Sequence, residues 1–246
     1  MGMMKPLSLA TAGIITTLLA LMPGAADAKI VTVGQTATPL AAPKCSNPSK
    51  CLIILERTTA LQTASDGVAN PMMVKRDGWI VSFTVGLAKL PGSAHTQRHF
   101  LHTLDTAYGG TPQLALTVLK PSRNDKYTVA AQSSMFHVIP FLGQVLEEPL
   151  SLPPSFTTFT ALRVTKGEVI GLTVPTWAPV LTYNLSTSKF TYRQSRTAGC
   201  PHAATSQTAQ LRVGANTRYL CAYSGTRVEY GATEVVNIPY PKKYVH

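Results

Sequence analysis

The chain has 246 residues, of which 45% are hydrophobic and only 13% are charged. Lys and Arg number 22 against 11 Asp and Glu, which gives a formal net charge of +11. This composition excludes a disordered chain, and four cysteines are too few for a miniprotein built around disulfides.

The first 28 residues have the three parts of a secretory signal peptide. Lys5 precedes an apolar stretch, 7–21, that contains no charged residue, and Ala26-Asp27-Ala28 fits the small-x-small cleavage pattern. The alternative is a membrane anchor, but Ser, Thr and Gly residues dilute the stretch. No second apolar run of that length follows, so we expect a secreted protein without a membrane span after cleavage.

The remaining chain shows no linker and no internal repeat, so one domain is expected. Residues 29–49 are rich in Pro, Thr and Ala and predict an extended, poorly ordered lead-in. The domain would occupy residues 50–238, and 239–246 would form a short tail. The sequence gives no prediction of the oligomeric state.

Four cysteines in an exported chain predict two disulfides, with three connectivities formally open. Proximity in sequence favours Cys45–Cys51 and Cys200–Cys221. A zinc site is the rival interpretation, but neither pair has the close spacing of zinc ligands. Structural disulfides are therefore expected.

Short β-branched and apolar runs, separated by Gly, Pro, Asn and Asp, predict β-strands along the whole domain. Their spacing is typical of an antiparallel sandwich or barrel. The expected strands are 51–56, 79–85, 113–120, 126–131, 156–164, 168–174, 210–213, 217–222 and 227–236.

Residues 93–106 are the one segment where a helix longer than two turns fits. On a helix, His95, His99, His102 and Asp105 would share a face, and imidazoles with a carboxylate suit zinc or copper. The Pro-Gly-Ser before them and the Gly-Gly after them favour a surface loop with exposed histidines instead. We therefore predict no metal cofactor, with these four residues as the only candidate ligands.

Trp177 lies between two prolines in the segment 174–179, so it belongs to a loop or a sheet edge. An indole presented there could stack on a sugar ring of a polysaccharide. Alternatively, it folds back and closes one end of the core, which is the commoner use of tryptophan.

Basic residues gather in the last third of the chain, where tyrosines alternate with them. The candidates for ligand contact are Arg193, Arg196, Arg212 and Arg218. They would form a surface for an anionic polymer, or they would only solvate the outer face of a sheet. No nucleic-acid-binding motif accompanies the charge, so a sequence-specific nucleic acid partner is not expected.

Three segments together resemble a family of uncharacterised secreted bacterial proteins. They are Arg76-Asp-Gly-Trp-Ile-Val-Ser-Phe83, Leu116-Thr-Val-Leu-Lys-Pro121, and 164–175 with its continuation Thr-Trp-Ala-Pro. The spacing of the last two cysteines is also similar, and the resemblance covers about residues 45–236. It implies a signal peptide and a jelly-roll-like β-sandwich, and it brings no established activity and no catalytic residues.

Motifs of hydrolases and nucleotide-binding enzymes are not found in the sequence. It has no Gly-x-Ser-x-Gly turn and no P-loop, and Glu147 and Glu148 would point to opposite faces of a strand. We therefore predict a non-enzymatic, extracellular or cell-surface protein that binds polysaccharide or an anionic wall polymer. The alternatives are a secreted metal-dependent or hydrolytic enzyme and a structural component of the envelope.

Overall fold

The computed structural model describes residues 28–44, 53–150, 161–198, 200 and 206–237. Strands dominate this part of the chain, together with helix α1 (Ala94–Tyr108) and the 3-10 turn η1 (Ile139–Phe141). The strands are β1 (Lys29–Val33), β2 (Leu55–Ser65), β3 (Val68–Ala69), β4 (Gly78–Gly86), β5 (Gln113–Ser122), β6 (Lys126–Gln132), β7 (Phe136–His137), β8 (Val145–Pro149), β9 (Leu162–Val164), β10 (Val169–Ala178), β11 (Leu181–Thr182), β12 (Thr191–Gln194), β13 (Asn216–Arg218), β14 (Cys221–Ser224), β15 (Arg227–Val228) and β16 (Tyr230–Val236).

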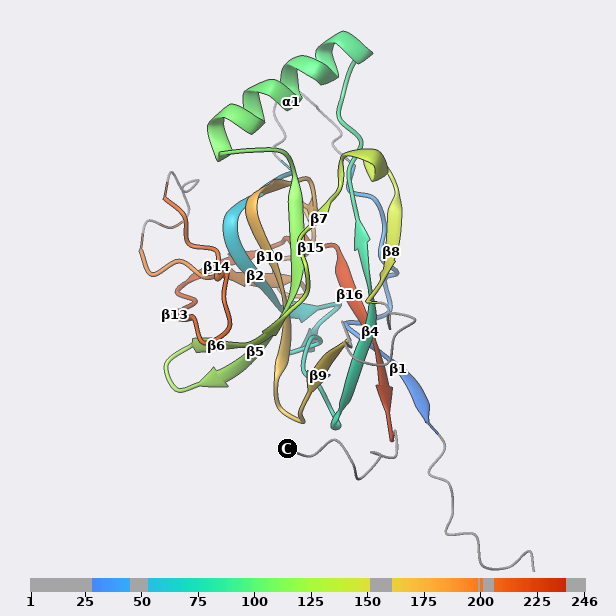
Figure 1. Cartoon of the computed structure of the whole chain (residues 1–246), viewed down its shortest axis with the longest axis vertical. Coiled ribbons are helices and arrows are strands. Elements are labelled where there is room, and N and C mark those ends of the chain that lie inside the picture. Colours follow the sequence, from blue (N-terminus) through green and yellow to red (C-terminus); the bar gives the residue numbers. More distant parts are fainter. Residues whose placement is uncertain (1–27, 45–52, 151–160, 199, 201–205, 238–246) are drawn as a thin grey trace, which may run out of the picture.

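Two antiparallel sheets pack face to face (Figure 1). The smaller sheet has the order β1-β16-β4-β8, with β9 also paired to β4, and the larger has the order β13-β6-β5-β10-β2-β12-β14. Fully buried side chains such as Phe83, Leu116 and Leu172 fill the space between them in one core. The predicted fold class, a single-domain antiparallel all-β sandwich of jelly-roll-like type, is confirmed.

The register of the smaller sheet shows which side chains point into this core. Tyr230 on β16 lies opposite Val85 on β4, and Ala232 lies opposite Phe83. These side chains are buried on the inner face, because directly opposed residues of an antiparallel pair share a face. A bulge then brings Glu234 opposite Ile80. The inner row of β16 therefore contains a carboxyl group, which was not anticipated from the sequence.

The larger sheet curls until its two edges approach each other. β13 and β14 stand at opposite ends of the strand order, yet only residues 219 and 220 separate them in the chain. A flat sheet of seven strands would place its edges about 29 Å apart. The curl therefore encloses a second interior, beside the core between the two sheets.

Polar side chains occupy part of this second interior. The hydroxyl of Thr173 on β10 is 2.9 Å from that of Thr59 and 2.6 Å from that of Thr117. Gln132 Nε2 donates to Thr117 Oγ1 and to the carbonyl oxygen of Gln210, at 2.8 and 2.9 Å. Because these groups satisfy one another, the network ties β2, β5, β6 and β10 to the covering segment 206–215.

Helix α1 lies across one end of the sandwich (Figure 1). Ser93 caps its start by accepting a hydrogen bond from Thr96 N–H, and Gly109 ends it with a φ of +82° that favours glycine. The surface-loop interpretation of this segment was wrong. The Pro-Gly-Ser and Gly-Gly sequences that suggested a loop are instead the boundaries of the helix.

The N-terminal segment is held more firmly than we expected. It is extended, but residues 29–33 form β1, which pairs along its length with β16. Further along, Thr38 donates from N–H and from Oγ1 to the carboxylate of Asp66, both at 2.7 Å. The predicted signal peptide and the tail from residue 239 onward lie outside the described residues.

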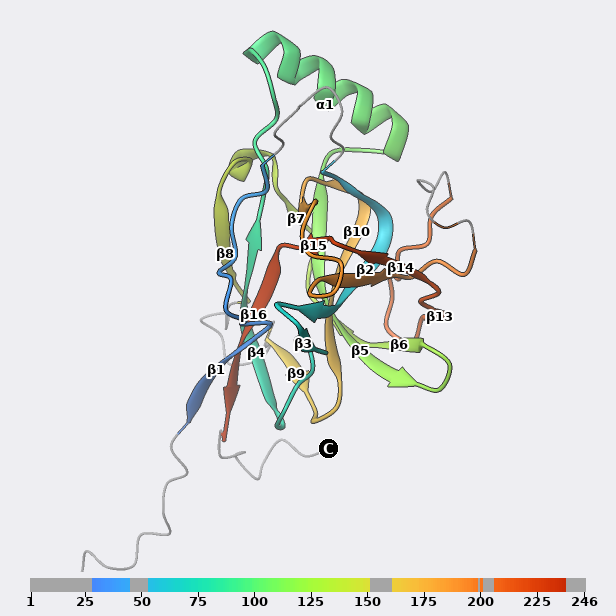
Figure 2. The same ribbon diagram turned by 180° about the vertical axis from the view of Figure 1, so that it is seen from behind.

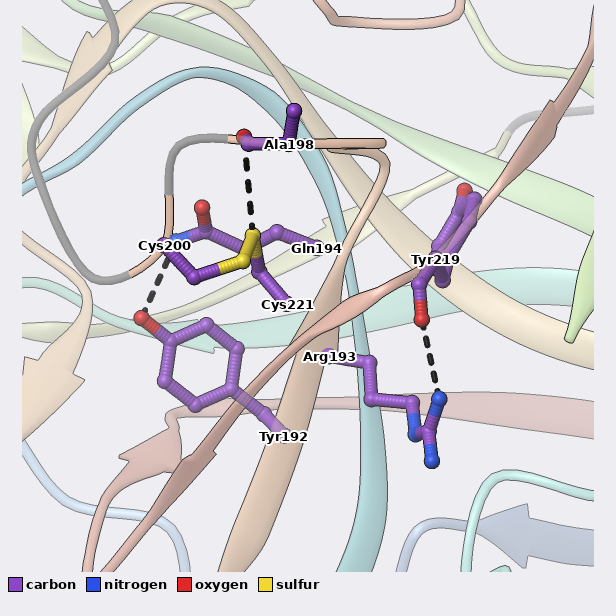
Figure 3. Close-up of a disulfide and its surroundings, with 7 residues drawn as sticks. All are labelled: Tyr192, Arg193, Gln194, Ala198, Cys200, Tyr219 and Cys221. Atoms are coloured by element: carbon purple, nitrogen blue, oxygen red, sulfur yellow. Dashed lines mark hydrogen bonds between the residues drawn. A yellow bond between two sulfur atoms is a disulfide. The ribbon is translucent and has the colours of Figure 1, made fainter.

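The disulfide predicted between Cys200 and Cys221 is confirmed (Figure 3). Its Cα atoms are 5.4 Å apart, and Cys221 is the first residue of β14. The bond fastens the loop after β12 to an edge strand of the curled sheet. The predicted Cys45–Cys51 bond lies outside the described residues.

Candidate anion-binding surface

Three neighbouring strands at one edge of the larger sheet form a basic face. Arg218 on β13 lies opposite Lys126 on β6, and Lys126 lies opposite Ser122 on β5. In the next row on the same face, Asn216, Thr128 and Lys120 are aligned in the same way. We call Lys120, Lys126 and Arg218, together with Arg123 in the β5–β6 turn and Arg212, the basic face; all five are exposed.

The side chains on the opposite side of these strands pack against the protein, so the basic residues face solvent. Tyr127 and Thr217 alternate with the basic rows and point the other way. The ring of Tyr127 lies 4.7 Å, centroid to centroid, from that of the buried Tyr219. The tyrosines that the sequence interleaves with basic residues therefore anchor the strands. Figures 1 and 2 show the β5–β6 hairpin projecting from the body of the molecule.

The acidic residue Asp125 lies beside this face, and its charge is already paired. Asp125 Oδ2 is 2.7 Å from Arg193 Nη1, which also donates to the carbonyl oxygen of Tyr219 at 2.9 Å (Figure 3). Arg193 was predicted to contact a ligand. Its guanidinium instead holds the β5–β6 turn against the β13–β14 connection, and in doing so it leaves the neighbouring positive charges uncompensated.

Arg212 lies in the turn that leads into β13. Gly214 N–H donates to the carbonyl oxygen of Val129 on β6, and Ala215 N–H donates to that of Arg212. These bonds extend the β6–β13 ladder by one residue and set Arg212 at its margin. Leu211 and Val213 on either side are exposed at 45% and 65%, so apolar surface borders the basic face here.

Arg196 does not belong to this surface. It is 3% exposed, and its Nη2 donates to Glu56 Oε1 at 2.9 Å and to the Glu56 carbonyl oxygen at 3.2 Å. The sequence position suggested a strand arginine facing solvent. The chain turns inward after β12 instead, and the guanidinium pairs with a buried carboxylate.

Trp177 is likewise unavailable to a ligand, because it is completely buried. It packs with Ile54 and Leu90 under the helix residues Leu101 and Leu104. Of the two interpretations of this residue, the structure supports the one in which it closes an end of the core. A sugar-stacking role for Trp177 is therefore excluded in this arrangement.

The four candidate metal ligands are not brought together. From His95 to Asp105 the helix advances about 15 Å, so their side chains form a row along the axis. Asp105 Oδ1 accepts a hydrogen bond from Trp177 Nε1 at 2.9 Å. Across the described ranges, the structure contains no group of three or more His, Cys, Asp or Glu side chains placed to hold a metal ion.

Arg212 and Arg218 were candidates from the sequence, whereas Lys120 and Lys126 were missed. The two strands predicted at 113–120 and 126–131 contain Lys120 and Lys126, so a pairing of these neighbouring strands could have brought them together. The contribution of Arg218 depends on β13 pairing with β6, and no local pattern indicates that pairing.

Comparison with protein-family models, with curated proteins and with solved structures found no match. The resemblance to the secreted bacterial family therefore stays a prediction. None of the helices in the described part of the chain is long and apolar enough to cross a membrane.

Proposed function

We propose that this protein is an extracellular or cell-surface binding protein that holds an anionic polymer, such as an acidic polysaccharide of the cell wall, on its basic face. The observation that carries the proposal is the alignment of Lys120, Lys126 and Arg218 on one exposed face, with the neighbouring Asp125 neutralised by Arg193.

The geometry favours an extended polyanion over a compact ligand. The exposed basic side chains stand in rows on three neighbouring strands, which are spaced about 4.8 Å apart. Two of these strands form the projecting β5–β6 hairpin. An open array of this kind can contact several charged groups along a polymer at once. With Trp177 buried, a neutral polysaccharide has no support from that residue.

Export supports the same proposal. The predicted signal peptide would deliver the chain outside the cell, and a disulfide such as Cys200–Cys221 persists in oxidising compartments. There the protein would meet wall and capsular polymers, many of which carry carboxylate or phosphate groups.

The test is binding to polygalacturonate, with uncharged dextran as the comparison, at several salt concentrations. We expect binding to polygalacturonate alone, with an affinity that falls as salt rises because bound counterions are released. The triple variant Lys120→Gln, Lys126→Gln, Arg218→Gln should lower the slope of log K against log salt by about three, roughly one for each lost contact.

A matched control removes the same charge elsewhere. Lys29, Lys89 and Arg98 are exposed and lie away from the β5–β6–β13 edge, so their exchange for Gln should leave the slope nearly unchanged. Equal losses in both triple variants would mean that only net charge matters and would contradict the proposal. Absence of binding in the unaltered chain would also contradict it and would favour a structural role.

A further inference from the structure

The inner face of the smaller sheet contains a carboxyl group that the fold does not pair. Glu234 is 1% exposed, and it occupies the same inner row of β16 as Tyr230 and Ala232. Its Oε1 atom is buried and has no hydrogen-bond partner among the residues that the structure describes. Buried polar atoms without a partner are rare in folded proteins, and an ion or ligand that completes the site is one of the accepted reasons for them.

The neighbouring backbone gives this side chain room. Glu234 leans over Gly78 on β4, where an added Cβ would come within 2.8 Å of Glu234 Oε1. Any larger residue at position 78 would displace the carboxyl group. The glycine therefore permits Glu234 to lie flat within the sheet interface.

A cavity of about 170 Å³ adjoins Glu234. The strands β1 and β3, which border it, lie toward the end of the sandwich away from α1 (Figure 2). It opens between β1, β3 and β16 and has room for about five water molecules. Its apolar lining includes Val31, Val33 and Met73, and Lys75 lies at its exposed margin.

At one wall of the cavity, Gly34 at the end of β1 packs closely against Met72. Gly34 has a φ of +88°, and a Cβ at this position would lie 2.7 Å from Met72 Sδ. Gly34 N–H donates to the carbonyl oxygen of Pro71 at 3.1 Å, which ties the end of β1 to the 70–73 segment. This hydrogen bond holds one side of the opening in place, and the side chains of Met73, Lys75 and Glu234 contribute to the rest of the lining.

We propose that this cavity binds a small aliphatic amine, whose ammonium group pairs with the carboxylate of Glu234 while its short carbon chain lies against Val31, Val33 and Met73. An ammonium group supplies a hydrogen-bond donor to this carboxylate and compensates its buried negative charge. A neutral or anionic ligand of the same shape would do neither. This site is separate from the basic face and does not depend on it.

The test is a titration of the intact chain with n-butylammonium in an amine-free buffer, followed by the amide NMR signals of residues 31–35 and 70–73. A ligand of this size should bind with a dissociation constant of about 1 mM, and 1-butanol and butyrate should bind about tenfold more weakly or not at all. Equal shifts with 1-butanol would show an apolar cavity only and would overturn the proposal.

Three variants distinguish ion pairing with Glu234 from a general effect of charge. Glu234→Gln keeps the shape and removes the charge, so it should weaken n-butylammonium binding about tenfold. Lys75→Met removes a like charge at the margin and should strengthen it. Glu148→Gln removes a carboxylate on β8 in the same sheet and should change nothing.

Unchanged binding in Glu234→Gln, or weaker binding in Lys75→Met, would contradict the assignment. If Glu234→Gln unfolds, the Lys75→Met result and the comparison of n-butylammonium with 1-butanol still decide it.

Discussion

Glu234 and Arg196 are both charged residues in the interior, and their surroundings differ. Arg196 has a carboxylate and a carbonyl oxygen of Glu56 within hydrogen-bond distance. Burial raises the pKa of the Glu234 carboxyl above its ordinary value, and the nearby charge of Asp77 raises it further. Folding therefore makes Glu234 harder to ionise than it is in the unfolded chain, whereas Arg196 and Glu56 compensate each other.

This difference predicts how stability depends on pH. Folding raises the pKa of this carboxyl group. At low pH the group is protonated in both the folded and the unfolded state and costs no stability. As pH rises through its folded pKa, the folded state loses stability relative to the unfolded chain. The melting temperature of Glu234→Gln minus that of the unaltered chain should therefore increase between about pH 4 and about pH 8. Glu229 also has a raised pKa, but it is present in both proteins and cancels in the difference.

Melting curves of the two proteins over this range provide the check, with Glu148→Gln as the control. A difference that stays constant, or that shrinks as pH rises, would show that Glu234 ionises in the folded state as easily as in the unfolded chain.

Helix α1 is attached to the sandwich through one side. None of its residues is fully buried, and its contact with the body includes Leu101, Leu104 and Tyr108 over Trp177. Hydrogen bonds from Trp177 Nε1 to Asp105 and from Gln97 Nε2 to the carbonyl oxygen of Leu90 add to it. Residues 101, 104 and 108 repeat at helical spacing, so they form a narrow stripe. The histidines lie on the remaining, exposed surface.

Loss of the Asp105 carboxylate should loosen this attachment. In Asp105→Ala the buried indole N–H keeps no acceptor, which should lower the free energy of unfolding by about 1–3 kcal/mol. Asp105→Asn retains an oxygen acceptor and should lose less. Urea unfolding followed by tryptophan fluorescence measures both effects.

His99→Ala is the matched control, because His99 is exposed on the same helix. Its stability should equal that of the unaltered chain. A loss in His99→Ala as large as that in Asp105→Ala would mean that the helix is held through its outer surface, contrary to the described packing.

At the scale of the whole molecule, the Cys200–Cys221 disulfide closes a long segment that covers the curled sheet. Its sequence separation of 21 residues corresponds to about 3 kcal/mol of stabilisation through the loss of freedom in the unfolded chain. The double variant Cys200→Ser, Cys221→Ser should lose about that amount in urea unfolding. A loss below about 1 kcal/mol would indicate that hydrogen bonds already fix this segment.

The sequence predicts the sandwich well where the two-residue period of a strand is clean. Residues 79–85 and the 113–131 hairpin are such cases, and they correspond to β4 and to β5 with β6. β1 and β12 were missed for different reasons: β1 is rich in β-branched residues but begins a Pro-, Thr- and Ala-rich segment that looks like a loop, and β12 is mostly polar. Their strand conformation depends on partners far away in the chain, β16 for β1 and β2 and β14 for β12.

The candidate sites show the same limit. Burial of Trp177 and Arg196 results from chain segments that pack over them, and a local pattern does not report those segments. The inward position of Glu234 depends on a bulge in the pairing of β16 with β4. Residue type and spacing can therefore nominate a charged or aromatic side chain, but the choice between surface and interior is made by tertiary contacts.

The strand order also determines when the chain can fold during its synthesis. β2 finishes at residue 65, but its neighbours in the strand order of the sheet are β10 and β12, more than a hundred residues further along, and β1 cannot pair until β16 is made. A nascent chain that ends before residue 169 has no partner for most of β2, so neither layer is complete. Pairing over such separations is slow. Local pairs such as β5 with β6 can form earlier, but the two sheets should stay incomplete and accessible to chaperones until nearly all of the chain has left the ribosome. An incompletely folded chain is what transport through a narrow protein-conducting channel requires.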